Sequence, residues 1–77
     1  MSAFSAERFI RERNEALLSL DKERIQAFMK KYDMQYPSDN DLVFWAGVHK
    51  AILAINAASP EQKEQSADWL LDHGFGL

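Results

Sequence analysis

The run DLVFWAGVHKAILAINAAS, residues 41–59, is apolar on almost every side of any helix drawn through it. A membrane-spanning helix needs roughly 20 apolar residues, whereas the apolar part here covers 14 residues, from 42 to 55. That part also contains His49 and Lys50, and a charge at the centre of a bilayer costs several kcal/mol. We therefore predict a buried helix at the centre of a soluble protein.

Two stripes of this helix differ in side-chain size, at about 100° per residue. The broad apolar face consists of Phe44, Val48, Ile52 and Ile55, with Trp45 at its edge. The second stripe holds only small residues, namely Gly47, Ala51, Ala54 and Ala58. Small residues let another backbone come close, so we expect packing on both sides, although Gly47 costs about 1 kcal/mol of helix propensity. The remaining sector of Ala46, Lys50 and Ala57 should face water. A homodimer seam and the lining of a ligand pocket are alternatives.

Start and stop signals predict three further helices. The clearest is at residues 59–62, where Ser59 is the N-cap, Pro60 takes the first helical position and Gln62 completes a capping box. Gly74 suits a left-handed C-cap, with Phe75 folding back on the last turn. The other expected N-caps are Ser5, Asp21, and Ser38 or Asp39. The sequence thus predicts one all-α, four-helix domain over residues 1–77, with helices at about 5–19, 21–33, 39–57 and 60–73.

Arg13 interrupts the apolar stripe of the first predicted helix. The expected stripes are Ala6, Phe9, Ile10, Leu17 and Leu20; then Ile25, Phe28, Met29 and Tyr32; and, in the last helix, Ala67, Leu70 and Leu71. Arg13 either extends past the edge of the core, or pairs with an acid from another helix, or marks an anion or partner site. The sequence leaves all three open.

Composition limits the classes of function. The chain has no cysteine and a net charge of −3, so it offers neither disulfides nor thiolate metal ligands. No basic stripe of the kind that phosphate contacts need is visible. The start, MSAFSAERFI, resembles no secretion signal. We expect a cytoplasmic protein without membrane association.

No pattern of catalytic or metal-binding residues is present. His49 and His73 are not at metal-ligand spacing, so we interpret His49 as a satisfied polar group at the edge of the core. His73 is most simply a cation at a helix C-terminus. The serines at 5, 38 and 59 are expected to be caps, and no glycine-rich phosphate loop occurs. We therefore predict no enzymatic activity, with no catalytic, cofactor-binding or metal-binding residues.

Aromatic residues outside the expected stripes suggest an interaction surface. Trp69, Tyr36 and Phe75, with the acids Asp68 and Asp72, would form it if they are exposed together, because Trp and Tyr dominate interface energies. The alternative is that these aromatics complete the core. The hypothesis is a protein–protein interaction module or regulator with an unknown partner, possibly homodimeric.

Two other functions remain as alternatives. The acidic last helix, with Glu61, Glu64, Asp68 and Asp72, could occupy a basic, nucleic-acid-binding groove of another protein. The third possibility is helix-turn-helix-like nucleic-acid binding through Arg24, Lys30 and Lys31, which the charge pattern disfavours.

The segments ERNEALLSLDKERIQAFMKKY (12–32) and VFWAGVHKAI (43–52) resemble small, uncharacterised bacterial proteins of mobile elements and structural surveys. The resemblance covers most of residues 4–56 and carries no functional motif. It implies a cytoplasmic accessory protein without catalytic activity, and it assigns no role to any residue.

Overall fold

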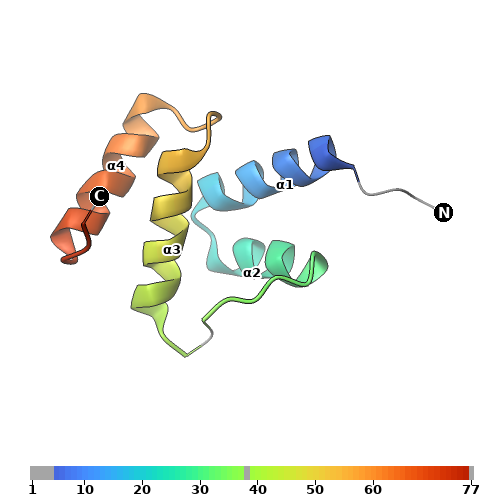
Figure 1. The fold of residues 1–77 in the computed structure, drawn as a ribbon, viewed down its shortest axis with the longest axis horizontal. Coiled ribbons are helices and arrows are strands. Elements are labelled where there is room, and N and C mark those ends of the chain that lie inside the picture. Colours follow the sequence, from blue (N-terminus) through green and yellow to red (C-terminus); the bar gives the residue numbers. More distant parts are fainter. Residues whose placement is uncertain (1–4, 38, 77) are drawn as a thin grey trace.

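The computed structural model describes residues 5–37 and 39–76, which form four helices and no strand (Figure 1). They are α1 (Ala6–Ser19), α2 (Lys22–Lys31), α3 (Asp41–Ala54) and α4 (Pro60–Asp72). α3 stands between α4 on one side and the α1–α2 hairpin on the other. The predicted all-α architecture with a central hydrophobic third helix is confirmed. None of the helices in the described ranges is long and apolar enough to cross a membrane.

The predicted caps at three of the four helix starts are confirmed. Ser5 accepts from the N–H of Arg8, and Asp21 accepts from the first turn of α2. Ser59 and Gln62 form the capping box at distances of 3.1 and 2.8 Å. Gly74 has a φ of 82°. These signals are local, so neighbouring residues alone decide them.

The start of α3 differs from the prediction. Its N-cap is Asn40, whose side chain accepts from the N–H of Val43 at 3.1 Å. Asp39 precedes the cap, and Ser38 lies outside the described residues. Each of these residues is a competent cap, so local chemistry alone did not choose among them.

The end of α3 also differs, because the helix stops at Ala54 and not near residue 57. Ile55 is extended, with φ −91° and ψ 134°, and the N–H of Ala58 donates to the carbonyl of Ile55 at 3.3 Å. This turn buries both side chains, which are 4% and 7% exposed. The free energy gained by burying these two apolar side chains thus exceeds the gain from extending the helix. α2 likewise ends at Lys31 and not near residue 33, and Asp33 is left-handed.

The core lies where α1, α2 and the broad face of α3 meet. It contains Ala16, Leu17, Ile25, Phe28, Phe44, Val48, Ile52, Ile55 and Ala58. Several expected positions are wrong. Ala46 is buried and does not face water, because it lies beside His49 on the side that α4 covers. Leu71 is 57% exposed, and Ser66 and Leu70 are the buried residues of α4. Ala6, Ile10 and Leu20 of the first stripe are also exposed.

Glu12 joins the two helices of the first hairpin. It accepts from Lys31 Nζ at 2.8 Å and from the hydroxyl of Tyr32 at 2.7 Å. These hydrogen bonds lower the pKa of Glu12, and the bond to Glu12 raises the pKa of Tyr32. A contact between Lys22 and Asp41 links the starts of α2 and α3. The α1–α2 hairpin therefore presents a fixed edge to α3.

Candidate functional site: an apolar groove beside α3

A groove of about 350 Å³ lies between the α1–α2 hairpin, the connection after α2, and α3. Its lining is Arg13, Leu17, Phe28, Met29, Met34, Gln35, Tyr36, Pro37, Val43, Phe44, Gly47, Val48 and Ala51. Arg13 is the one charged residue in this set. The groove therefore offers an apolar interior with a single cation.

The connection between α2 and α3 forms one wall of the groove. The N–H of Met34 donates to the carbonyl of Met29 at 2.8 Å, and the rings of Tyr36 and Phe44 form a T-shaped pair with centroids 6.2 Å apart. Met34 and Val43 remain 41% and 48% exposed. Methionine fits irregular partner surfaces readily, because its side chain is flexible and polarizable. Sequence patterns could not reveal this wall, since its shape depends on packing against α3.

One side of α3 is not covered by any helix of the described residues 5–37 and 39–76. Its residues are Val43, Gly47, Lys50 and Ala54, all exposed, and we call them the bare face. α3 packs on both sides as predicted, against α4 and against α1, but Gly47 and Ala54 of the small stripe are exposed. A Cβ added at Gly47 would meet nothing within 4 Å. α4 and the α1–α2 hairpin flank α3 (Figure 1). Gly47 and Val43 also line the groove, so the two surfaces are continuous.

Arg13 lies half-buried at the α1 side of the groove. Its guanidinium donates twice to Asn14 Oδ1, at 3.1 and 3.0 Å. No carboxylate of residues 5–37 or 39–76 forms an ion pair with it; the two ion pairs there are Lys22–Asp41 and Lys31–Glu12. Pairing with an acid of another helix is therefore not found in the described chain. Two alternatives for Arg13 remain, a position at the edge of the core and an anion or partner site.

The aromatic residues predicted as a surface are divided between two places. Tyr36 lies in the groove, whereas Trp69 stacks with Phe75 at 6.1 Å near the end of α4. A row of ring contacts through Phe44, Trp45 and His49 links the two places. Tyr36, Trp69 and Phe75 are each only partly exposed. Tyr36 packs against the core, and the interaction surface of these residues stays a prediction.

His49 is buried between α3 and α4, with an exposure of 7%. Its Nδ1 shares a hydrogen bond of 2.9 Å with the hydroxyl of Ser66, and its ring stacks on Trp69 at 4.6 Å. Burial lowers its pKa below the usual 6.5, and His73 lowers it further. The prediction of a satisfied polar group is confirmed. The ring of His73 also stacks on Trp69, with centroids 4.0 Å apart, and its Nδ1 forms a hydrogen bond with the Trp69 carbonyl.

The predicted acids of α4 remain exposed on one side of that helix. They are Glu61, Glu64, Asp68 and Asp72, and none forms an ion pair within the described ranges. The cations of α2 differ, because Lys31 is held by Glu12 while Arg24 and Lys30 are exposed. All four acids of α4 are thus available for a partner, whereas one of the three cations of α2 is paired within the chain.

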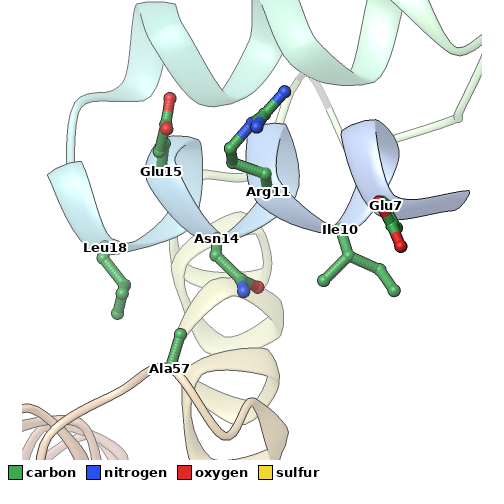
Figure 2. A pocket seen from close by; sticks show the side chains of 7 residues that line it. All are labelled: Glu7, Ile10, Arg11, Asn14, Glu15, Leu18 and Ala57. Carbon is green, nitrogen blue, oxygen red and sulfur yellow. The ribbon is translucent and has the colours of Figure 1, made fainter. Parts of the chain in front are cut away.

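A second hollow lies between α1 and the turn after α3 (Figure 2). Ile10, Asn14 and Leu18 extend to the side of α1 on which Ala57 lies, whereas Arg11 and Glu15 point to the opposite side. Its polar groups therefore do not converge on one point, which a binding site for a small polar ligand requires. The groove beside α3 is the better candidate.

Comparison with known proteins adds no assignment. Neither a family model, nor a curated protein, nor a solved structure matches this chain. The resemblance to small bacterial proteins therefore stays a prediction. In the described part of the chain, no three His, Asp or Glu side chains come together to hold a metal ion.

Proposed function

We propose that the protein is a non-catalytic interaction module that binds another protein through the groove and the bare face of α3. The observation that supports this most is their continuity at Val43 and Gly47. Together they form an apolar surface on a small protein, and contiguous apolar surface is typical of a binding site. In this proposal Tyr36 belongs to the contact surface. Trp69 and Phe75, which stack on each other, support α4.

A protein partner fits better than a small molecule. Small-molecule sites are concave and enclose most of their ligand, whereas this groove opens onto a helix face. From Val43 to Ala54 the bare face extends about 16 Å at 1.5 Å per residue. A surface of that length suits a second element of secondary structure. The expected location remains the cytoplasm.

The test uses Gly47→Gln, which places a side chain on the bare face. Since nothing lies within 4 Å of the added Cβ, the fold should survive, and circular dichroism checks this. Ala6→Gln is the matched control, because Ala6 is an exposed helical residue away from the groove. Tagged protein is used to capture partners from the source cells, and its mass is followed by sedimentation.

We expect Gly47→Gln to lose a captured protein or to lose self-association. We expect Ala6→Gln to retain both. A dimer lost in this way would make the partner a second copy. Binding that is equal for both variants would contradict the assignment of this surface.

A second candidate function rests on the acidic side of α4. Four exposed acids without ion pairs in the described chain could enter a basic groove of a nucleic-acid-binding protein. Such a complex would weaken steeply as salt rises, whereas apolar contact at α3 would be much less sensitive. A salt series on any captured complex, with Glu64→Gln/Asp68→Gln beside Gly47→Gln, separates the two.

A further inference from the structure

We infer that the occupant of the groove and bare face is an amphipathic helix of a partner protein, apolar along its centre and acidic on both flanks. This inference rests on the proposed function. The bare face is itself one side of a helix, and it carries no sheet edge to which a strand could add. Because Gly47 has no side chain, a second helix axis can approach α3 closely, as helix pairs do at about 8–10 Å.

Apolar side chains on the occupant follow from the two surfaces. The centre of its contact stripe would lie over Gly47, where a small or medium side chain fits. Its neighbours one turn away would enter the groove against Met34 and Val43, the two exposed large hydrophobic residues in its lining. Residues at i, i+3, i+4 and i+7 provide such a stripe.

Acidic flanks follow from the charges at the two edges. Arg13 lies at the α1 edge of the groove, where its guanidinium contacts Asn14 and no carboxylate of the described chain. Lys50 lies at the opposite edge, toward α4, with Nζ 5.9 Å from the centroid of the Phe75 ring. The groove lining and the bare face contain no acid. A helix with Asp or Glu on both sides of its apolar stripe would therefore pair with one cation on each side.

The experiment selects ligands from a displayed library of 15-residue helical peptides. Their apolar stripe is varied among Ala, Val, Leu and Met, and their flanking positions among Glu, Gln and Lys. The baits are the full chain, the neutral variant Arg13→Gln/Lys50→Gln, the charge-reversed variant Arg13→Glu/Lys50→Glu, and Gly47→Gln. Circular dichroism checks that each bait is helical.

We expect the full chain to enrich peptides with Glu in both flanks. We expect the charge-reversed bait to enrich peptides with Lys there. The neutral bait should bind the acidic winners roughly two- to thirty-fold more weakly, because two exposed ion pairs are lost. Enriched peptides without a flank preference would overturn the acidic partner and leave the proposed function standing. If no peptide were enriched, or if enrichment on Gly47→Gln equalled that on the full chain, both the acidic partner helix and the proposed function would be overturned. A dimer disrupted by Gly47→Gln would replace the partner helix with a second copy.

Discussion

At the scale of single residues, Gly47 and His49 are neighbours on α3 with opposite surroundings. A Cβ added at Gly47 would meet no atom within 4 Å, so the space beside this residue is open. His49 is enclosed by Ser66, Trp69 and Trp45. Gly47 lowers the helix propensity of α3. The burial of His49 is stabilising only while its imidazole is neutral. Each difference predicts a measurable change in the free energy of unfolding.

Gly47→Ala should stabilise the protein. Alanine is better than glycine in a helix interior by about 1 kcal/mol, and the added Cβ meets no atom within 4 Å. The midpoint of thermal unfolding should rise by about 4–8 °C in a domain of this size. Gly74→Ala is the control with the opposite sign, because Gly74 has a φ of 82° and alanine there is strained by about 1–2 kcal/mol. If the midpoint did not rise with Gly47→Ala, helix propensity at this position would not limit the stability of the protein.

His49 should make stability fall on mild acidification. Its pKa is lowered in the folded protein, chiefly by burial, so below about pH 6.5 the unfolded chain binds a proton that the folded one does not. The free energy of unfolding should therefore decrease from about pH 6.5 down to the lowered pKa, and the effect should level off below it. Urea unfolding between pH 5 and pH 8 measures this slope.

His49→Gln should remove most of that slope, whatever its effect at pH 8. His73→Gln should keep most of it, since the charge of His73 is the smaller cause of the shift. If His49→Gln and the unmodified chain had parallel pH profiles, His49 would not be the group that titrates.

At the scale of elements, α4 depends on its first turn. The capping box of Ser59 and Gln62 satisfies two backbone N–H groups of that turn. Ser59→Ala should cost about 1 kcal/mol, and Ser59→Asp, which retains an acceptor, should cost less. Denaturant midpoints of the two variants give the comparison. Equal losses would show that the hydroxyl itself, and not its capping bond, matters.

The same elements show what the sequence could predict. Caps such as those of Ser5, Asp21 and Ser59 are local, so they were predictable. The end of α3 at Ala54 was not, because no glycine or proline marks it and the burial of Ile55 and Ala58 decides it. The groove was predicted least, since four separate segments form it. The sequence marked Arg13 and Tyr36 as exceptions to an apolar stripe or helix, and it marked the small stripe with Gly47 and Ala51 as an alternative seam or pocket lining.

At the scale of the whole molecule, one core joins the two hairpins. Ile25 of α2 is fully buried in the same cluster as Phe44, Val48 and Ile52 of α3. Both tryptophans lie in the other hairpin, on α3 and α4. The molecule is also thin, with a shortest dimension of 18 Å. Its hairpins therefore depend on a small shared interior.

Ile25→Ala should weaken both hairpins together. The cavity should cost about 2–5 kcal/mol, out of roughly 4–12 kcal/mol expected for 77 residues. Tryptophan fluorescence reports on α3 and α4, whereas circular dichroism reports on all helices. The two denaturation midpoints should shift by the same amount. A shift seen by circular dichroism alone would mean that the α1–α2 hairpin unfolds separately.

The open space around Gly47 has a consequence for how the sequence can change over generations. Within the monomer, alanine or a larger residue fits this position and makes a better helix, so mutation and drift should replace the glycine. A lineage that keeps glycine there gives up stability without any benefit to its own fold. Retention of Gly47 among descendants of this gene would thus record selection by a molecule that packs against α3.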